Sequence, residues 1–303
     1  TYSDDRGHTW TTPEHMTYTP GGQKLKTPRA CPKLWRCQNG KYLFWFHNHS
    51  GLTFEGRNPV WLTGGVVRDG HMHWSQPEIL LYDADPETWM SYPDLIEQDG
   101  RYWVTETQKS VARIHELDRN LLEGLWSQGT VKTIAQEGLL GEFTSGETKL
   151  DGTIDVKRCG GVSLAVWLTL DEDSTGKPLV DTRDADGRGI ALLTAENGAV
   201  EVELFDGKTK AAWQCDPGLI APGKRHHVVA IVDAGPKIIT FVVDGRLSDG
   251  GTARQYGWGR YEGPLGDIAG SGRLRVAPEV AKARLYGRYL RTSEAIANSY
   301  AGR

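Results

Sequence analysis

Short runs of apolar and polar residues, separated by turn signals, follow one another along the chain. Three of them within residues 1–126 are aromatic or β-branched: 42–47, 60–63 and 101–107. Each adjoins a pair that favours a tight turn: Asn39-Gly40, Gly64-Gly65 and Asp99-Gly100. Helical periods of useful length are absent, so we predict antiparallel hairpins. Their spacing is typical of the four-stranded blades of a propeller, of which we count about three.

A second series of strands follows residues 127–141, a stretch that mixes Gly, Ser and Thr and has few strand signals. Most of its runs alternate apolar and polar positions, as half-buried antiparallel strands do: 162–168, 189–195, 200–206, 226–233, 238–245 and 274–277. Asp-Gly or Asn-Gly pairs between the runs accept positive φ. Thr292 and Ser293 precede an Ala-rich stretch, which predicts one or two turns of helix. We therefore predict an all-β chain in which blades at 1–126, a linker at 127–141 and a two-sheet sandwich at 142–303 succeed one another.

Composition adds constraints on partners and compartment. A length of 303 residues favours two domains, and 11 Trp with 37 Gly suit a β-rich fold. A net charge of −4, without Lys/Arg clusters among aromatic residues, excludes a nucleic-acid groove. No apolar run is long enough to cross a bilayer. The chain opens on Thr1 without a signal peptide, so we expect a processed or truncated start and a secreted or periplasmic protein.

Four cysteines show no metal-type spacing: Cys31, Cys37, Cys159 and Cys215. We predict buried free thiols, while a disulfide stays open as an alternative outside the cytosol. No organic cofactor is expected. The acidic loops 171–173 and 184–186 offer oxygen ligands for a structural calcium ion, and the alternative for them is solvated turns.

The segments KRHHVVAIVD, ITFVVDGRL and ARLYGRYLRTSEAIANSY carry a resemblance to a known family. A His-His-Val strand, a Val-Asp-Gly hairpin and a final Tyr-x-Arg-x-Leu segment recur in laminin G-like domains, which have the concanavalin A-like sandwich. The resemblance covers essentially all of residues 142–303. It implies an accessory module that binds carbohydrate or packs against its neighbour, rather than a catalytic one.

The segment from Ser3 to Trp10 fits the pattern S-x-D-x-G-x-x-W. Asp5 can accept hydrogen bonds from the turn backbone, Gly7 can take an unusual φ, and Trp10 can pack beneath the hairpin. This pattern resembles the Asp-box of sialidase-like propellers. The resemblance implies that Asp5 is a structural residue at the blade periphery and not a catalytic acid.

Residues 29–107 resemble the C-terminal blades of sialidases through RNPVWLTGG, RDGHMHWSQP and SYPDLIEQDGRYWVTE. The resemblance implies that Arg57 grips a substrate carboxylate and that Tyr92 is the nucleophile. It also implies that Asp94 belongs to the substrate-binding motif and that Glu106 is the base beside Tyr92. The residue types suit this chemistry, because a neutral phenol avoids the repulsion that a carboxylate would feel from an anionic sugar. Arg57 could clamp a carboxylate and favour the phenolate.

The chain also departs from the sialidase pattern. His47 stands where the resemblance implies a second arginine, and the glutamate expected near Cys31 is missing. The first arginine and the acid/base aspartate would belong to blades before Thr1. About three blades do not close a propeller, so we expect further segments from upstream sequence or another chain, or a different fold.

Three functions remain open. The leading hypothesis is a sialidase-like glycoside hydrolase, of the exo-acting kind, that cleaves an acidic glycan or polysaccharide. The second is a non-catalytic glycan-binding protein, in which Trp213, Tyr256 and Trp258 stack on sugar rings unless they are core residues. The third is a polysaccharide lyase, in which His47 and Tyr92 abstract a proton from a uronic acid. His47 and His49 share a strand face and could hold a metal, but no further ligand is placed, so none is predicted.

Overall fold

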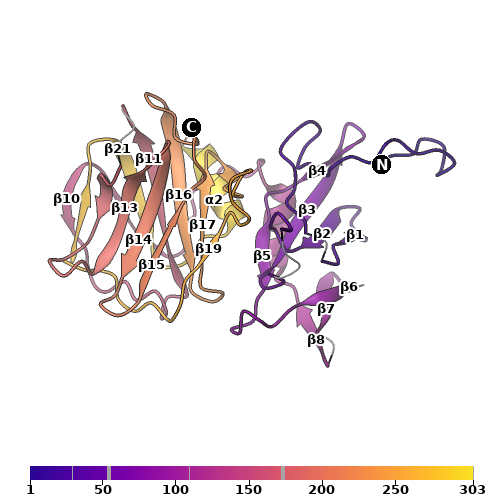
Figure 1. Ribbon diagram of the computed structural model, residues 1–303, viewed down its shortest axis with the longest axis horizontal. Helices are drawn as coiled ribbons and strands as arrows, with labels where there is room; N and C mark the ends of the chain where they lie inside the picture. The colour runs from indigo at the N-terminus through magenta and orange to yellow at the C-terminus, as the bar shows by residue number, and fades with distance from the viewer. Residues whose placement is uncertain (29, 53–55, 109, 172–174, 303) are drawn as a thin grey trace.

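The computed structural model describes residues 1–28, 30–52, 56–108, 110–171 and 175–302. Figure 1 shows the C-terminal sandwich on one side and the N-terminal sheets on the other. Nearly all regular structure is β-strand, and all strand pairs are antiparallel, as the sequence predicts. No helix in the described part of the chain is both long and apolar enough to span a membrane.

The N-terminal part contains two sheets within the described residues, rather than the three blades that we expected. One sheet has the order β1-β2-β3-β4, with β5 also pairing with β3: β1 Lys33–Arg36, β2 Tyr42–Phe46, β3 Val60–Arg68, β4 His71–Trp74 and β5 Glu78–Leu81. The other has the order β6-β7-β8: β6 Ser91–Gln98, β7 Arg101–Gln108 and β8 Val111–Glu116. The predicted turns at Asn39-Gly40 and Asp99-Gly100 join β1 to β2 and β6 to β7.

The prediction of a turn at Gly64-Gly65 is wrong, because β3 runs through both glycines and the turn follows at Asp69-Gly70. A Cβ on Gly64 would lie 2.8 Å from Trp126 Cδ1, and one on Gly65 would lie 2.6 Å from Trp74 Cζ3. The two glycines therefore make room for neighbouring side chains. They do not reverse the chain.

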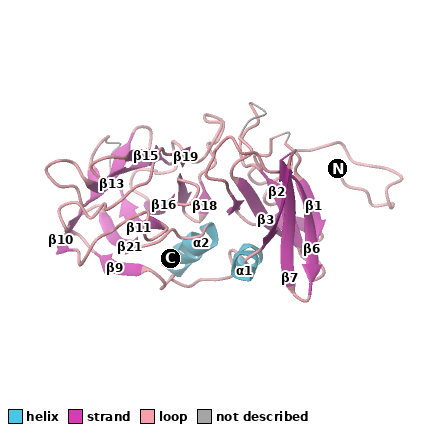
Figure 2. Ribbon diagram, turned by 90° about the horizontal axis from the view of Figure 1, so that it is seen from below, coloured by secondary structure: helices cyan, strands magenta, loops and turns pink. Residues whose placement is uncertain are grey.

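A helix that the sequence pattern did not predict packs against the sheet of β1 to β5 (Figure 2). The helix α1 runs over Arg119–Ser127, and its N-cap Asp118 accepts a hydrogen bond from the backbone N–H of Asn120 at 2.7 Å. Its buried residues are Leu122, Leu125 and Trp126. Leu122 and Leu125 stand three residues apart and therefore share one face of the helix, which packs against β3.

The C-terminal part is the predicted two-sheet sandwich. One sheet has the order β10-β20-β12-β13-β14-β15: β10 Gly146–Lys149, β20 Arg273–Val276, β12 Pro178–Asp181, β13 Gly189–Ala195, β14 Ala199–Phe205 and β15 Lys210–Gln214. The other has the order β18-β17-β16-β11-β21-β9, with β19 also pairing with β17: β18 Arg246–Leu247, β17 Ile238–Val243, β16 Arg225–Asp233, β11 Gly161–Thr169, β21 Val280–Tyr286, β9 Leu139–Phe143 and β19 Gly259–Arg260. The chain ends in the helix α2, Thr292–Ala301, which is longer than the one or two turns expected.

The seven-stranded sheet is buried on both faces. Along β16, Val228, Ala230 and Val232 face the sandwich core, whereas Val229 and Ile231 face a second core. That second core includes Phe46 and Trp61 and several other aromatic residues of the N-terminal sheet. A strand covered on both sides needs apolar residues at successive positions, which explains the unbroken run from 228 to 232. The seven-stranded sheet thus lies between two cores, one shared with the six-stranded sheet and one shared with the sheet of β1 to β5 (Figure 1).

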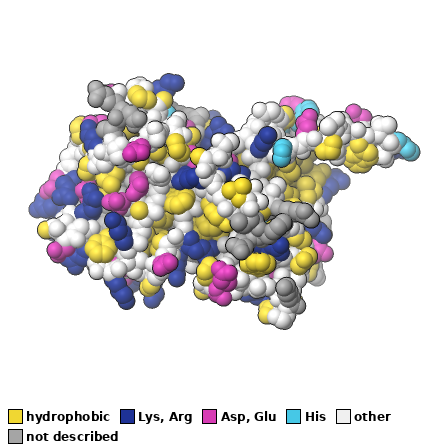
Figure 3. All heavy atoms as spheres, viewed as in Figure 1, with side chains coloured by type: hydrophobic (Ala, Val, Ile, Leu, Met, Phe, Trp, Pro, Cys, Tyr) yellow, Lys and Arg dark blue, Asp and Glu magenta, His cyan; other side chains and the backbone are white. Residues whose placement is uncertain are grey.

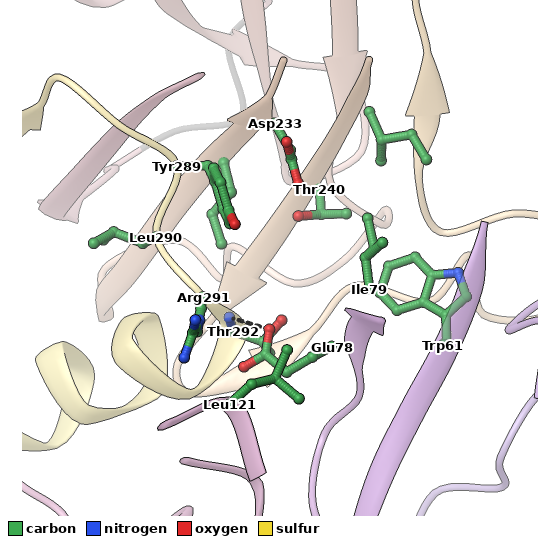
Figure 4. A pocket seen from close by; sticks show the side chains of 12 residues that line it. Trp61, Glu78, Ile79, Leu121, Asp233, Thr240, Tyr289, Leu290, Arg291 and Thr292 are labelled. Atoms are coloured by element: carbon green, nitrogen blue, oxygen red, sulfur yellow. Dashed lines mark hydrogen bonds between the residues drawn. The ribbon is translucent and has the colours of Figure 1, made fainter. Parts of the chain in front are cut away.

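A buried carboxylate fastens the N-terminal sheet to α2 at the junction of the two parts. Glu78 on β5 accepts hydrogen bonds from the backbone N–H groups of Thr292 and Ser293, both at 2.8 Å, and from the Ser293 hydroxyl at 2.7 Å. Figure 4 shows this contact beside a small cavity that Asp233 and Tyr289 also line. Glu78 therefore caps the N-terminus of α2. The N-cap residue itself, Arg291, makes no side-chain capping hydrogen bond.

Asp233 at the same cavity predicts a pH-dependent stability. Burial, helped by the nearby Glu78 carboxylate, raises the pKa of Asp233 to about 7, against the pull of a hydrogen bond from the Gly235 N–H. Between the unfolded pKa near 3.8 and the folded value, the native state binds the extra proton. Stability should therefore fall as the pH rises through this interval and stay low above it.

We expect Asp233→Asn to remove that slope and to raise the free energy of unfolding at pH 8 by roughly 1–3 kcal/mol, since the side chain is only half-buried. Urea unfolding at pH 5, 6, 7 and 8 measures it. The exposed Asp151→Asn is the control, and parallel curves for the wild type and Asp233→Asn would contradict the prediction.

The N-terminal segment projects beyond the body of the molecule (Figures 1 and 3). Its turn is closed by Asp5, which accepts hydrogen bonds from the Thr9 backbone N–H at 2.9 Å and from the Thr9 hydroxyl at 2.7 Å. Hydrogen bonds, chiefly those from Thr9, lower the pKa of Asp5 to about 2. Trp10 Nε1 donates to the Gly7 carbonyl at 3.0 Å, so the ring lies against the turn, although the residue remains 63% exposed.

Candidate functional site

Tyr92 lies at a β-bulge at the start of β6. Ser91 pairs with Thr107 and Asp94 with Thr105, so Tyr92 and Pro93 together stand opposite Glu106. Tyr92 has a φ of 51°, which is rare and strained for an aromatic residue. The bulge turns the side chain outward, and 66% of it is exposed. The phenol is therefore presented to solvent by a locally strained backbone.

Arg57 lies beside the bulge, in the loop that leads into β3. Its Nη1 donates a hydrogen bond to the Ser91 hydroxyl at 3.1 Å, and its guanidinium lies 5.0 Å from the centroid of the Trp89 ring. The Arg57 Nε is buried and has no hydrogen-bond partner among the described residues. Ser91 directly precedes Tyr92, so the guanidinium and the tyrosine belong to one site. A guanidinium in this place suits the planar oxygens of an anion.

Glu106 is buried behind the bulge, and its carboxylate is held by β8. Arg113 Nε donates to Glu106 Oε1 at 2.5 Å, and His115 Nε2 lies 3.4 Å from the same oxygen. Arg113 also pairs with Asp83 at 2.9 Å. Within the described chain, Glu106 Oε2 has no partner, and neither oxygen contacts the Tyr92 hydroxyl. Glu106 on β7 thus lies opposite Tyr92 in the strand register, while its carboxylate is paired with Arg113.

His47 and His49 follow β2 and are buried. Burial lowers the pKa of His47 to about 3, and the nearby His49 and Arg57 act in the same direction. Burial lowers the pKa of His49 to about 4, with Lys26 nearby. Neither ring nitrogen of His47 makes a hydrogen bond within the described residues. Both imidazoles are therefore neutral near pH 7, and His47, at 1% exposure, lies behind Arg57 rather than at the surface.

Asp94 lies apart from this cluster. Its Oδ1 accepts hydrogen bonds from the Trp35 indole N–H at 3.2 Å and from the Leu95 backbone N–H at 3.0 Å. The side chain therefore joins β6 to β1. In the part of the chain that the structure describes, Asp94 makes no contact with Arg57.

Five further residues complete the site and were not singled out from the sequence: Asp83, Trp89, Ser91, Arg113 and His115. Arg113 and His115 alternate along β8, so both side chains lie on the strand face that Glu106 also occupies on β7. Two basic residues on the inner face of a short strand are the signal that could have identified them.

The remaining expected ligands are engaged in structure or undescribed. All four cysteines are free, and Cys37 and Cys215 are buried as expected while Cys159 is exposed. The described residues contain no group of three or more His, Cys, Asp or Glu that could hold a metal. Residues 172 and 173 of the first acidic loop lie outside the described residues. Asp184 of the second loop accepts hydrogen bonds from the backbone N–H groups of Asp186 and Arg188.

The aromatic residues considered as sugar platforms are packed. Trp258 is 7% exposed and stacks near Tyr256, with 4.6 Å between the ring centroids. Trp213 lies against the sandwich core and donates to the Gly257 carbonyl at 3.3 Å. These rings support the fold and the junction.

A family model described as the concanavalin A-like lectin/glucanases superfamily matches residues 144–295. Among solved structures, the chain is similar to the CBM40 of Ruminococcus gnavus IT-sialidase bound to α2,6-sialyllactose, with 16% identity over 54% of this chain and 100% of that one and a TM-score of 0.39. It is similar to Trypanosoma rangeli sialidase, with 14% identity over 99% of this chain and 65% of that one and a TM-score of 0.37. A leech intramolecular trans-sialidase shows 13% identity over 55% of this chain and 28% of that one, with a TM-score of 0.34. No curated protein sequence gives a significant match.

Proposed function

Because the chain belongs to the concanavalin A-like lectin/glucanases superfamily through residues 144–295, we propose that it acts on a carbohydrate and that Tyr92 and Arg57 form its reactive site. The observation that carries the proposal is the exposed, strained Tyr92 directly after the serine that Arg57 contacts. Backbone strain concentrates at functional sites, because the surrounding structure must maintain it. The proposed substrate is an acidic glycan, since the Arg57 guanidinium beside Ser91 and Tyr92 has a charge and a geometry that suit a carboxylate.

The proposed reaction is glycoside hydrolysis through a tyrosyl intermediate. The Tyr92 phenol oxygen bonds to the anomeric carbon while the glycosidic bond breaks, and the leaving oxygen takes a proton from water. The phenol proton passes to a base. Glu106, which lies opposite the bulge in the strand register, is the proposed base. The oxygen of a second water then bonds to the anomeric carbon while the bond to Tyr92 breaks, and the phenol oxygen regains its proton from the base. Arg57 holds the substrate carboxylate and stabilises negative charge on the phenol oxygen.

The same residues bear on two rival functions, a lyase and a glycan-binding protein. A lyase that uses His47 as base requires the ring to reach the sugar, and its 1% exposure does not favour this. A purely glycan-binding protein is favoured by the Glu106–Arg113 ion pair, which occupies the carboxylate that a nucleophilic tyrosine needs. The binding function is therefore the second candidate.

Replacement of Tyr92 by phenylalanine tests the proposal. We expect Tyr92→Phe to abolish cleavage of an acidic glycan, at least a thousandfold in kcat, because no phenol oxygen remains to form the intermediate. The thermal midpoint should stay nearly unchanged, since the ring is 66% exposed. The assay measures reducing ends released from a panel of sialylated and uronate-containing oligosaccharides.

Tyr2→Phe is the matched control, because Tyr2 is 63% exposed and lies in the projecting N-terminal segment. Retained cleavage by Tyr92→Phe would overturn the assignment. Glycan binding by calorimetry without turnover in the wild type would favour the binding protein.

A further inference from the structure

A second cleft lies at the far end of β3 from Arg57. It has a volume of about 240 Å³, and its walls come from β3, β4, α1, α2 and the turn between β17 and β18. Arg57 precedes Val60 at the start of β3, whereas Arg68 ends the strand. Eight strand steps separate these ends by about 26 Å. The cleft is therefore distinct from the site at Tyr92.

The lining of the cleft contains two arginines and a histidine. Arg68, His73 and Arg246 line it, and no acidic residue does so among the described residues. Val66 pairs with His73, and Arg68 follows two positions later, so Arg68 and His73 share one face of the sheet. The whole chain has 39 acidic and 35 basic residues, so this one-signed lining is a local feature. It creates a positive potential in a hollow, which favours an anion.

The floor of the cleft is fixed by contacts across the junction. Gln128 Nε2 donates to the Gln76 carbonyl at 2.9 Å, and the Gln76 N–H donates to Gln128 Oε1 at 2.7 Å. Gln76 Oε1 in turn accepts from the Leu247 N–H of the sandwich at 3.1 Å. Trp74 and Tyr300 add aromatic surface from the two sides. A floor held in this way loses little freedom when a ligand binds.

The geometry points to a binding site for an anionic saccharide in this cleft, with Arg68 and Arg246 on its carboxylate or sulfate group. Guanidinium groups match the planar oxygens of such groups and can bind them with two hydrogen bonds. Arg246 Nη2 donates a hydrogen bond to Gln23 at 2.8 Å, which holds the side chain in place, and no other donor of the Arg246 guanidinium is engaged among the residues that the structure describes. That the anionic group is carried by a saccharide rests on the proposed function. The preference of the cleft for an anion rests only on its basic lining.

The site gives the molecule two separate contacts with one acidic glycan. Tyr92 and Arg57 would act on one sugar unit, while the cleft holds another part of the same chain. Both parts of the molecule build the cleft, Arg68 from the N-terminal sheet and Arg246 from the sandwich. Binding there would therefore also stabilise the junction.

Calorimetric titration of the full chain tests the inference with four probes: trigalacturonate, a sulfated carrageenan tetrasaccharide, neutral maltotriose and sodium sulfate. We expect one or both acidic saccharides to bind and maltotriose to bind far more weakly. The probe that binds shows whether the site takes carboxylate or sulfate. Arg68→Ala/Arg246→Ala should weaken binding about tenfold or more, because charge-assisted hydrogen bonds are lost.

The matched control Arg36→Ala/Lys208→Ala removes the same charge from exposed positions elsewhere and should leave the affinity within about twofold. Arg68 and Arg246 are both exposed, so the double variant should keep its unfolding midpoint. The titration measures binding and does not require cleavage, which separates a failure of this inference from a failure of the proposed reaction. Equal affinity of the wild type and Arg68→Ala/Arg246→Ala, equal binding of maltotriose, or sulfate ion binding as tightly as the saccharides would overturn it.

Discussion

Replacing Arg113 with alanine is expected to lower the free energy of unfolding by about 3 kcal/mol, because the buried Glu106 carboxylate then loses its cation. The Glu106 side chain is fully buried, and Arg113 Nε lies 2.5 Å from it. A charge left alone in such a place costs far more than the pair itself contributes. Urea unfolding at pH 7, followed by tryptophan fluorescence, measures the loss.

Two variants show whether the cause is the orphaned charge. Adding Glu106→Gln to Arg113→Ala removes the charge and should recover part of the stability. Arg101→Ala breaks the exposed ion pair with Glu116 on the neighbouring part of the same sheet, and the unfolding midpoint should barely move. If Arg101→Ala and Arg113→Ala shift the midpoint equally, the buried pair has no special role.

The junction should be equally sensitive to Glu78. We expect Glu78→Ala to lower the free energy of unfolding by about 2–4 kcal/mol, because two backbone N–H groups and the Ser293 hydroxyl lose their buried acceptor. Burial raises the pKa of Glu78, because it costs the carboxylate its hydration. Glu78→Gln, which keeps one acceptor oxygen without the charge, should therefore lose less than Glu78→Ala.

The exposed Glu87→Ala is the control for the loss of one carboxylate. Urea unfolding gives the stability, and limited proteolysis within residues 127–141 reports whether the junction opens. Loss of stability without faster cleavage would show that Glu78 stabilises α2 alone and does not fasten the two parts.

The sandwich strands were predictable because the alternation of apolar and polar residues that marks a half-buried strand is visible in the sequence itself. Alternation along 200–206 places Val200, Val202 and Leu204 in one core, as observed. The turn assigned to Gly64-Gly65 failed for a different reason. A glycine pair predicts a turn only when no distant side chain needs its space, and Trp126, which lies against Gly64, is 62 positions away in the sequence. The helix α1 was missed because nine residues give too short a helical pattern to recognise.

For the site, the sequence predicted residue types and not their partners. Arg57 and Tyr92 were paired only through a family resemblance, and their catalytic roles stay predictions. The partner of Glu106 depends on the register of β7 with β8, which pairs Glu106 with Arg113. A shift of one residue in that register would turn the side chains of β8 to the opposite face. Such a register comes from packing, and a single sequence does not display it.

The burial of both faces of the seven-stranded sheet bears on how the protein can be divided. A fragment starting at residue 142 would carry Val229, Ile231 and Val242 on a face that Phe46 and Trp61 otherwise cover. Such a fragment would expose a broad apolar surface to solvent and would self-associate in solution. Transfer of this sandwich to another protein must therefore include the N-terminal layer that covers its outer face, or replace the apolar side chains of that face with polar ones.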